Sequence, residues 1–494
     1  MESSLIHRKF EKACSKYPDK PALIFQEDNR FFKLTFSQVL DYSGRITGLL
    51  KEYGLSFSQR VAIYMENNPF WFSAYLGIVS AGLTAVPMDY MLSKDEVTNI
   101  LIDSESKVVF CSRNSIKDLQ GLDTPFLKDL KIVCLDSDFI KGLKINNQSL
   151  LDFDQESIAS LLYTSGTTDN PKAVCLSHKN LMTNFADIYK LGFYGDKDIF
   201  LCILPLHHAY PFMVNLLVPL FVGSSVVLPK SLRAKDILFC LRRQGVSIFV
   251  GVPQVFSLIY QNLCQKLKAF EFIIKVLGNL RSKTGINISK AVFFFVHRKF
   301  GRSLRFLVCG GAKLDEKIAA GFFNLGFDIM EGYGLTETSP VVSFNPPKKA
   351  KIGSVGKPLI SVAVRIHNPN RQGQGEILVK GGSVTKGYFR KPHLTAESLK
   401  DGWFFTKDIG YLDKDNYLYI TGRKDECIVL SSGKNIWPKE LEQVYASRPS
   451  IKEICIFNRL DHLYAVVVPD KSYFTKAEAL DYHGRIKKDI EEVS

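Results

Sequence analysis

Short apolar runs alternate with longer segments of mixed polarity along the first 350 residues. Clear examples of the runs are 199–204, 247–252 and 304–308. Short apolar runs are typical of strands that are buried on both faces, and the intervening segments have helical character. The alternation therefore predicts an α/β fold in which helices and largely buried strands form layers.

The pattern changes at about residue 350. Segments 362–366, 375–380 and 416–420 have the composition of strands and are separated by Gly, Pro and Asn, which predicts a smaller β-rich subdomain. Segment 209–229 has no charged residue but contains Pro219. We expect a buried helix that ends near this proline, followed by a strand at 225–228; a transmembrane helix is the less favoured alternative.

The bulk composition is that of an ordinary folded protein. A chain of 494 residues can form two or three subdomains, and 46% hydrophobic with 23% charged residues does not indicate disorder. Ten cysteines without a Cys-x-x-Cys pair favour reduced thiols in a cytosolic setting over a metal or disulfide framework. Residues 1–21 are charged and lack the apolar core of a signal peptide.

Part of the net charge of +14 is concentrated in segment 261–305, where ten basic residues accompany a single acidic residue, Glu271. The basic residues are Lys266, Lys268, Lys275, Arg281, Lys283, Lys290, Arg298, Lys299, Arg302 and Arg305. Apolar residues are interleaved with them. This pattern suits peripheral contact with an anionic membrane surface, or alternatively a solvated helical face over a core. Nucleic acid is less favoured, because no recognised binding motif is present.

The strongest chemical signal is the loop 162–172, Leu-Tyr-Thr-Ser-Gly-Thr-Thr-Asp-Asn-Pro-Lys. It follows one strand-like run, 158–162, and precedes another, 173–176. Backbone N–H groups and hydroxyls in such a loop can bind phosphate oxygens, with a lysine as counter-charge. A polar surface turn is the alternative. No Walker A motif and no Gly-x-Gly-x-x-Gly after a strand occurs, which disfavours kinase-type and Rossmann dinucleotide functions.

The loop resembles the phosphate-binding loop of the adenylate-forming (AMP-binding) superfamily, which includes acyl-CoA synthetases, luciferases and the adenylation domains of peptide synthetases. Five more segments resemble motifs of that superfamily in its own order: 204–208 (Leu-Pro-Leu-His-His), 309–312 (Cys-Gly-Gly-Ala), 331–337 (Glu-Gly-Tyr-Gly-Leu-Thr-Glu), 402–408 (Gly-Trp-Phe-Phe-Thr-Lys-Asp), and 422–425 (Gly-Arg-Lys-Asp) with 430–436. Six ordered matches are far more specific than one. The Ser-Ser-Gly-Lys-Asn run and the long basic insertion are most similar to those of long-chain fatty acyl-CoA synthetases.

The resemblance implies how the triphosphate of ATP would be held. Lys172 and the loop hydroxyls would bind the β- and γ-phosphates, and Thr336 would donate to the α-phosphate. Glu337 would hold Mg²⁺, since this hard cation prefers carboxylate and phosphate oxygens. Singly, each residue also has a structural interpretation, such as a helix cap or a turn.

The resemblance also implies contacts with the nucleoside and the acid. Tyr333 would stack on adenine, Asp408 would accept hydrogen bonds from the ribose hydroxyls, and Arg423 would reach ribose or phosphate. His208 would lie near the carboxylate, with a buried structural histidine as the alternative. The catalytic candidates are Thr164, His208, Thr336 and Glu337. The nucleotide-binding candidates are Ser165, Gly166, Thr167, Thr168, Lys172, Gly310, Gly311, Ala312, Glu331, Gly332, Tyr333, Gly334, Asp408, Ile420 and Arg423.

The implied architecture is a large N-terminal domain, 1–424, with two α/β layered subdomains and a β-rich one, and a small mobile α+β domain, 425–494, after a hinge at Asp425. The implied reaction joins a fatty acid, with a long chain favoured, to ATP and then to CoA, giving acyl-CoA, AMP and pyrophosphate. Alternatives are ligation to an acyl carrier protein, or a catalytically impaired homologue that binds only nucleotide or acyl ligand. The expected location is the cytoplasm, with possible association with the inner face of a membrane.

The sequence departs from the superfamily at several positions. Asp169, Ala173 and Lys407 replace glycines; aspartate tolerates left-handed backbone better than most residues, whereas Ala173 requires a negative φ. The superfamily also carries a lysine near its C-terminus that promotes adenylation. Only 70 residues run from Asp425 to Ser494 (494 − 425 + 1), and Lys487 and Lys488 come too early to match it. We therefore expect the chain to stop before that lysine, in an incomplete C-terminal domain.

Overall fold

The computed structural model describes residues 5–426, apart from 28–29, 122–127, 145–151, 165–171 and 347–348. Beyond 426 it describes a subset that includes 451–459 and 462–470. The chain forms two compact units. Unit 1 comprises Met1–Val364, Val379–Phe404 and Asp413–Leu418, and unit 2 comprises Arg365–Leu378, Phe405–Leu412 and Tyr419–Ser494. The predicted boundary at residue 425 remains a prediction.

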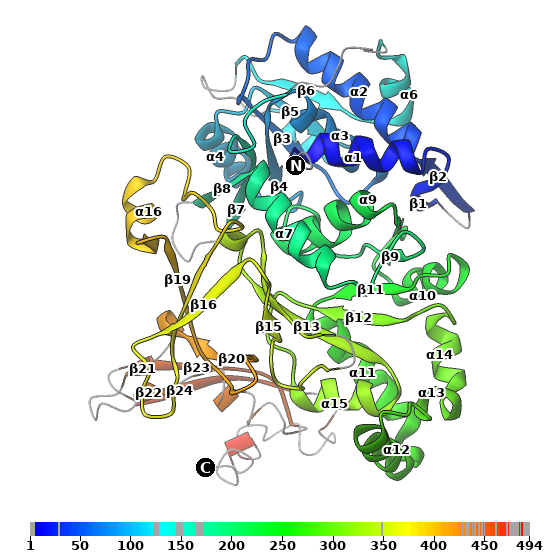
Figure 1. Cartoon of the computed structure of the whole chain (residues 1–494), viewed down its shortest axis with the longest axis vertical. Helices are drawn as coiled ribbons and strands as arrows, with labels where there is room; N and C mark the ends of the chain where they lie inside the picture. Colours follow the sequence, from blue (N-terminus) through cyan, green and yellow to red (C-terminus); the bar gives the residue numbers. More distant parts are fainter. Residues whose placement is uncertain are drawn as a thin grey trace. The chain divides into compact units, whose positions relative to one another are not determined.

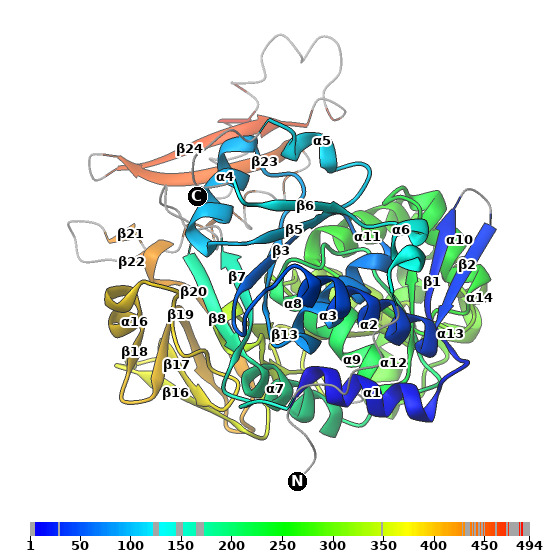
Figure 2. The same cartoon turned by 90° about the horizontal axis from the view of Figure 1, so that it is seen from above.

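A six-stranded sheet forms the first layer of unit 1 (Figure 2). Its order is β6 (Lys131–Cys134), β5 (Val108–Cys111), β3 (Arg60–Tyr64), β4 (Thr84–Met88), β7 (Ile158–Thr164) and β8 (Lys172–Ser177). The strands from β6 to β7 are parallel, and β8 pairs with β7 in the antiparallel direction. β7 and β8 are the strands expected on either side of the hydroxyl-rich loop, so this prediction is confirmed.

Helices cover both faces of this sheet. Residues of α4 (Lys94–Ser104) pack with Ala62, Tyr64 and Val109 on one face, where α4 begins with a capping box from Ser93. α2 (Phe36–Glu52) and α3 (Pro69–Ser80) pack against each other; a Cβ atom at Gly77 would lie 2.7 Å from Ile46 Cγ2. This glycine allows close helix contact, and α3 is consequently buried on nearly all sides.

A nine-stranded sheet forms the second layer (Figure 1). Its order is β15 (Lys357–Pro358), β14 (Val341–Phe344), β13 (Asp328–Gly334), β12 (Phe306–Cys309), β11 (Ile248–Gly251), β9 (Ile199–Leu201), β10 (Ser225–Leu228), β1 (Pro21–Glu27) and β2 (Arg30–Thr35). The strands from β13 to β1 are parallel. Three of them coincide with the apolar runs at 199–204, 247–252 and 304–308, so the predicted α/β fold is confirmed.

The alternation of side chains along β11 assigns the two faces of this sheet. Phe249 points to the side of α11 (Pro253–Leu267) and α15 (Glu316–Asn324), where its ring lies 5.6 Å from Phe256, which in turn lies 6.0 Å from Phe322. Ile248 and Val250 point to the opposite face. That face is covered by α7 (His178–Lys190) and by the helical segment 209–222.

Segment 209–222 corrects one expectation. The helix does not end near Pro219 but continues as α8 (Ala209–Pro211), a π-helical turn at Phe212–Leu217 and α9 (Val218–Val222). Pro219 is tolerated because it occupies the first turn of α9, where no intrahelical N–H is required. Gly223, with φ of +82°, ends the helix, and β10 follows as predicted. Among the described residues, no helix is both long and apolar enough to cross a membrane.

The basic segment forms a series of short helices on unit 1. They are α11, the 3₁₀ turn Lys268–Phe270, α12 (Glu271–Thr284), α13 (Ser289–Val292) and α14 (Phe294–Phe300). In Figure 1 they lie beside α15 at the β11–β13 side of the nine-stranded sheet. α12 packs on α15 because Gly278 leaves room for Asn324, whose Oδ1 would be 1.9 Å from a Cβ at that position.

The predicted β-rich region is confirmed as a five-stranded sheet. It contains β16 (Val362–His367), β17 (Gly375–Gly381), β18 (Leu399–Lys400), β19 (Trp403–Leu412) and β20 (Leu418–Arg423). The last strand begins two residues later than expected, because Asp413 and Asn416 form a turn: the Asp413 carboxylate accepts the N–H of Tyr417 at 2.9 Å, and Asn416 has φ of +65°. In unit 2, β23 (Ile451–Arg459) and β24 (His462–Pro469) form an antiparallel hairpin.

Candidate active site

The phosphate-binding candidates lie on the hairpin of β7 and β8. Thr164 and Lys172 are paired across it, at the mouth of the loop, and Thr164 Oγ1 lies 3.5 Å from the Lys172 carbonyl oxygen. Ser165, Gly166, Thr167 and Thr168, together with Asp169, lie outside the described residues. Ala173 is buried in β8 and is not among the residues with positive φ, as its identity requires. The two described residues that flank the loop, Thr164 and Lys172, therefore lie at the same end of two adjacent strands.

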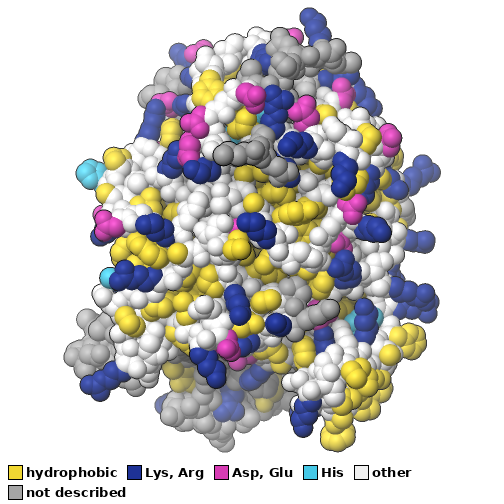
Figure 3. Space-filling view, in the orientation of Figure 1, with side chains coloured by type: hydrophobic (Ala, Val, Ile, Leu, Met, Phe, Trp, Pro, Cys, Tyr) yellow, Lys and Arg dark blue, Asp and Glu magenta, His cyan; other side chains and the backbone are white. Residues whose placement is uncertain are grey.

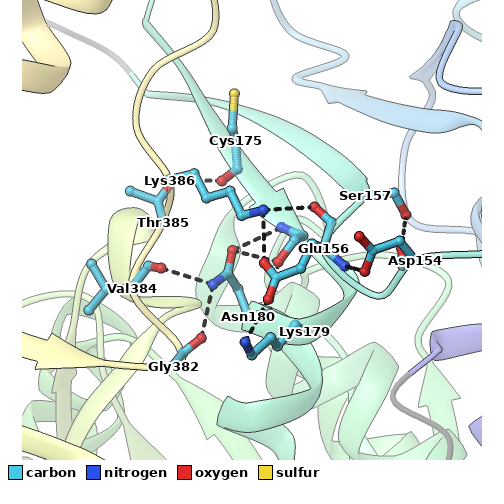
Figure 4. Close-up of polar contacts among 11 residues, drawn as sticks. Asp154, Glu156, Ser157, Cys175, Lys179, Asn180, Gly382, Val384, Thr385 and Lys386 are labelled. Atoms are coloured by element: carbon cyan, nitrogen blue, oxygen red, sulfur yellow. Dashed lines mark hydrogen bonds and ion pairs between the residues drawn. The ribbon is translucent and has the colours of Figure 1, made fainter. Parts of the chain in front are cut away.

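A second segment, residues 382–389, is attached to this hairpin by hydrogen bonds (Figure 4). The Asn180 side chain at the start of α7 donates to the carbonyl oxygens of Gly382 (2.9 Å) and Val384 (2.8 Å). Lys386 forms an ion pair with Glu156 at 2.8 Å. Further along, the backbone of Phe389 donates to Ala173 O at 2.8 Å, so the segment runs beside β8.

This attached segment positions Glu337. The Thr385 N–H donates to the Glu337 carbonyl oxygen at 2.8 Å, and the Tyr388 hydroxyl donates to Glu337 Oε1 at 2.8 Å. Burial and the Glu337 carboxylate both raise the pKa of Tyr388, so it remains a donor. Within the described residues, Oε2 of Glu337 accepts no hydrogen bond.

The environment of Glu337 fits Mg²⁺ rather than an all-protein metal cage. No group of three or more His, Cys, Asp or Glu side chains that could hold a metal ion is found among the residues that the structure describes. One oriented carboxylate with an available oxygen is the kind of ligand that Mg²⁺ uses when substrate phosphates complete its coordination. Glu337 is therefore a suitable ligand, and Tyr388 orients it.

Glycines shape the nucleoside end of the site. β12 ends at Cys309, which pairs with Glu331 of β13, so the 309–312 and 331–334 segments are adjacent. Gly311 has φ of +86°, which a residue with Cβ rarely adopts. A Cβ at Gly334 would lie 1.9 Å from the Pro340 carbonyl oxygen. The two predicted nucleotide segments, including Gly310, Ala312, Gly332 and Tyr333, are thus brought together at the carboxyl ends of parallel strands, which is where α/β sheets bind ligands.

Among the residues of the 331–334 segment, Glu331 has a raised pKa. Its side chain is buried, and burial raises its pKa to about 7, with a smaller opposing effect from a backbone hydrogen bond. A carboxyl group with this pKa is partly protonated at neutral pH, whereas an exposed one would be ionised. Glu331 can therefore donate as well as accept a hydrogen bond at the site.

The two histidines of the 204–208 segment differ in environment. Asn67 holds the segment by donating to Leu204 O at 2.7 Å and accepting the Leu206 N–H at 3.0 Å. His207 is buried, and burial lowers its pKa to about 4, so its 3.7 Å approach to Asp89 is not an ion pair at neutral pH. The ring of His208 is exposed and lies 4.1 Å from that of His207, centroid to centroid.

An apolar pocket adjoins the nucleoside segments. Gly310, Gly311, Gly332, Tyr333 and Gly334 line one end, and the pocket continues along the sheet face between β9, β11, β12 and the helices α7 and α9. Its further walls are Ile188, Leu191, Phe193, Tyr194, Phe200, Tyr210, Val214, Val218, Ile248, Val250, Val308, Cys309, Pro340, Val341 and Phe344. The lining contains no charged side chain, and its free volume for water-sized molecules is about 80 Å³.

Three tyrosines line this otherwise apolar pocket: Tyr194, Tyr210 and Tyr333. The Tyr210 hydroxyl donates to the Val308 carbonyl oxygen at 3.1 Å and is therefore satisfied within the protein. The Tyr194 hydroxyl is buried and has no hydrogen-bond partner among the described residues. The pocket consequently suits a ligand with an apolar body and room for at most a small polar group.

The ribose-binding candidates lie in unit 2. Asp408 is buried, and its carboxylate forms an ion pair with Arg423 at 3.2 Å. Thr421 of β20 donates its hydroxyl to Ile409 O at 3.3 Å, which places the candidate Ile420 on the strand paired with that of Asp408. The hinge candidate Asp425 forms an ion pair with Lys407 at 3.2 Å. Lys407 adopts φ of +63°, as expected for a residue that replaces a glycine.

Two site residues, Tyr388 and Asn180, were not predicted from the sequence. Tyr388 is 51 residues from Glu337, and Asn180 reaches carbonyl groups more than 200 residues away. Neither belongs to a motif with a spacing that indicates its partner. Their roles became visible only when the fold placed segment 382–389 beside β8.

Comparison with known proteins gives a consistent picture. The model of one protein family, that of the AMP-binding enzymes, matches residues 10–389. The chain is 28% identical to a sulfoacetate–CoA ligase of Cupriavidus necator, over 93% of this chain and 84% of that protein. It is 30% identical to a long-chain-fatty-acid–CoA ligase of Mycobacterium bovis, over 82% of this chain and 71% of that protein.

The fold is similar to that of a solved ligase. The O-succinylbenzoate coenzyme A synthetase of Bacillus subtilis, in complex with AMP, superposes with a TM-score of 0.77. The match covers 97% of this chain and 91% of that chain at 24% sequence identity. At this identity the similarity supports the fold alone.

Proposed function

The chain belongs to the AMP-binding enzyme family, and we propose that it is an AMP-forming acid–CoA ligase whose acid has an apolar body, with fatty acids the favoured class. The single observation that supports this substrate class is the pocket that begins at Gly310, Gly311 and Tyr333 and continues between uncharged walls. A carboxylate at the nucleoside end would leave the body of the acid in apolar surroundings.

The relatives alone do not select a long-chain fatty acid. They are ligases of chemically different acids: sulfoacetate, long-chain fatty acids and O-succinylbenzoate. The resemblance to long-chain fatty acyl-CoA synthetases in particular is therefore narrower than the relatives support, since they include ligases of other acids. The pocket argues against sulfoacetate, because its sulfonate would need a cationic partner and no lysine or arginine lines the pocket.

The first step of the proposed reaction joins two anions. A carboxylate oxygen attacks the α-phosphorus of ATP, the bond from that phosphorus to the bridging oxygen of the β-phosphate breaks, and pyrophosphate leaves. Lys172 and the hydroxyl of Thr164, which are paired across the hairpin, would supply positive charge and hydrogen bonds to the phosphates. Thr336 lies on the same 3₁₀ turn as Glu337 and would donate to the α-phosphate. Mg²⁺, when bound at Glu337, would neutralise phosphate charge.

In the second step the sulfur of CoA attacks the acyl carbon and AMP leaves, so that a thioester replaces the mixed anhydride and the thiol proton passes to solvent. Glu331 and Tyr333 would hold the adenine ring during both steps, and Asp408 with Arg423 would bind the ribose. These assignments rest on position in the family motifs and on the neighbouring groups described above. Two alternatives differ from this proposal: a carrier-protein thiol as acceptor, or ligand binding without turnover.

The test is ATP–pyrophosphate exchange with Mg²⁺ across acetate, sulfoacetate, octanoate, palmitate and a hydroxylated aromatic acid. The aromatic acid is included because of the unpartnered Tyr194 hydroxyl. We expect exchange with octanoate or palmitate and none with sulfoacetate. Exchange only with sulfoacetate or acetate would contradict the substrate class. CoA and a carrier protein are then compared as acceptors by AMP release, and absence of AMP with both, in spite of ATP binding, would indicate the binding-only alternative.

A further inference from the structure

Helix α12 packs on the protein along its inner side and exposes a stripe of apolar side chains along its outer side. The inner side includes Gly278 and the buried Arg281, which donates to the carbonyl oxygens of Phe323 (2.8 Å) and Phe327 (3.2 Å) and forms an ion pair with Asp328. The outer side includes Phe272, which is 79% exposed, and Val276, which is 47% exposed. At 100° per residue these positions lie nearly opposite the inner ones. An outer stripe of this kind has no role in packing the fold.

The neighbouring helices extend the outer stripe into a continuous surface. Phe293 is buried and joins its exposed neighbours: its ring lies 6.5 Å from Phe270 and 6.2 Å from Phe295, and Phe295 lies 6.2 Å from Phe294. Phe294 is 61% exposed. We call this surface the α12–α14 patch; its exposed apolar side chains are Phe270, Phe272, Ile273, Val276, Phe294 and Phe295. Figure 3 shows hydrophobic side chains gathered over this part of the molecule, at the lower right.

The patch is surrounded by positive charge that the protein does not neutralise. Glu271 is paired with Lys275 at 2.9 Å, and Arg281 and Arg305 are paired with Asp328 and Asp198. The remaining basic side chains are exposed and, among the described residues, have no carboxylate partner: Lys266, Lys268, Lys283, Lys290, Arg298, Lys299 and Arg302. Contiguous exposed apolar side chains are expensive to leave in water and indicate a partner surface. The unpaired basic groups around them indicate that this partner is anionic.

The charges identify the kind of partner. A second copy of the same patch would bring lysine against lysine in a symmetric interface, which like-charge repulsion disfavours. A solvated helical face would carry polar residues at positions 272, 276 and 294 rather than Phe, Val and Phe. Phenylalanine tips surrounded by lysine and arginine match a lipid bilayer, where aromatic rings enter the boundary between headgroups and acyl chains and basic residues attract anionic headgroups.

We propose that the α12–α14 patch docks on the surface of an anionic lipid bilayer. Phe272 and Phe294 enter the boundary region, and Lys283 and Lys290 lie at the headgroups. The protein is held at the surface and does not span the bilayer. This goes beyond the ligase reaction, and its test does not depend on which acid the enzyme activates.

The test is flotation of the full chain with vesicles of phosphatidylcholine alone and of phosphatidylcholine with 30% phosphatidylglycerol, at 50 and 500 mM NaCl. Two variants probe the two parts of the patch: Phe272→Ser with Phe294→Ser, and Lys283→Glu with Lys290→Glu. All four positions are exposed, so folding should be preserved, which circular dichroism can verify. Matched controls are Leu232→Ser, also a large exposed apolar residue (65%), and Lys12→Glu, an exposed lysine on α1 (Ile6–Lys16).

We expect binding to the anionic vesicles that falls at high salt, and at least about tenfold weaker binding for each double variant. The lysine variant loses two basic residues, each of which contributes on the order of a factor of five near an anionic surface. The phenylalanine variant loses two rings that would be buried in the boundary region. The controls should bind like the unmodified protein. Equal binding to both vesicle types, or no loss in either double variant, would overturn the proposal. A concentration-dependent dimer that Phe272→Ser with Phe294→Ser dissociates, without vesicle binding, would assign the patch to a second copy and would overturn it as well.

Discussion

The two units hold their nucleotide-binding candidates in different ways. In unit 1, Glu337 is fixed by a backbone N–H and a half-buried tyrosine hydroxyl, both on a segment that is itself bonded to β8. In unit 2, Asp408 and Asp425 are held by ion pairs with Arg423 and Lys407, whose side chains are 40% and 54% exposed. Partly buried hydrogen bonds in a network hold a carboxylate more firmly than ion pairs with a solvent-exposed cation, because such pairs contribute about 0–1 kcal/mol.

The difference indicates a division of labour. The groups proposed to meet the phosphates and Mg²⁺ are preorganised, so they need not rearrange when charge develops in the reaction. The Asp408 carboxylate, in contrast, already has a partner, and a ribose would have to compete with or join Arg423. Ion pairs with a solvent-exposed cation exchange readily, which suits the hinge predicted at Asp425. The predictions below test whether unit 1 is the more sensitive of the two.

The largest effect is expected for Glu337→Gln. The amide oxygen can still accept the Tyr388 hydrogen bond, so the local structure should persist, but the negative charge that attracts Mg²⁺ is lost. We expect the rate of ATP–pyrophosphate exchange to fall by roughly 10²–10³ with little change in melting temperature. The matched control is Glu52→Gln, an exposed glutamate of α2. Full activity in the Glu337 variant would remove it from the catalytic machinery.

Glu331→Gln tests the buried carboxyl group of unit 1. Its folded pKa of about 7 lies above the ordinary value of 4.5, so the folded state retains a proton that the unfolded state has lost. Its contribution to stability is therefore complete below about pH 4.5 and is lost as the pH rises to about 7. The variant should escape this loss and gain up to roughly 3 kcal/mol over the unmodified protein above pH 7.

Urea unfolding at several pH values between 5 and 8.5 measures this difference. The two stability curves should approach each other at the acid end and separate as the pH rises. Glu376, which is buried but paired with Lys424 at 2.9 Å in unit 2, supplies the contrast. Glu376→Gln should show no such gain, since it removes a partner from a buried position. Parallel curves for Glu331→Gln would mean that the carboxyl group is ionised in the fold.

How far the sequence could predict this site depends on the range of the contacts. Lys172, Glu337 and Asp408 could be predicted as site residues because each lies within a contiguous motif. The Tyr388–Glu337 bond was not, because it joins two segments whose approach depends on the register of β8, and tyrosine has no spacing rule that indicates such a partner. Short apolar runs predicted the layered α/β fold correctly. The helix end predicted near Pro219 was wrong, because a π-helical turn shifts the proline to a position where it is tolerated. The pocket walls come from nine separate helices, turns and strands and have no signature along the chain.

A moderate effect is expected for Tyr388→Phe. Loss of the hydroxyl removes the donor to Glu337 Oε1 and leaves the carboxylate free to rotate, while the ring keeps its packing. Removal of such an orienting group typically weakens metal binding or activity by 10–100-fold. We expect the Mg²⁺ concentration for half-maximal exchange to rise about tenfold. The control is Tyr189→Phe, whose side chain is exposed. An unchanged Mg²⁺ dependence with reduced activity would assign Tyr388 a purely structural role.

The smallest effect is expected in unit 2, for Lys407→Gly. Left-handed backbone costs a residue with Cβ about 1 kcal/mol, which glycine avoids, but glycine also loses more conformational entropy on folding, by up to about 1 kcal/mol. The exposed pair with Asp425 contributes little. These effects nearly cancel, so stability should change by less than about 1 kcal/mol and exchange activity by less than threefold. Lys407→Val provides the contrast, since a β-branched residue at φ of +63° is strained and should be clearly less stable. If Lys407→Gly instead reduced activity as strongly as Tyr388→Phe, the Lys407–Asp425 pair would have a role in the reaction, and the two units would be equally preorganised.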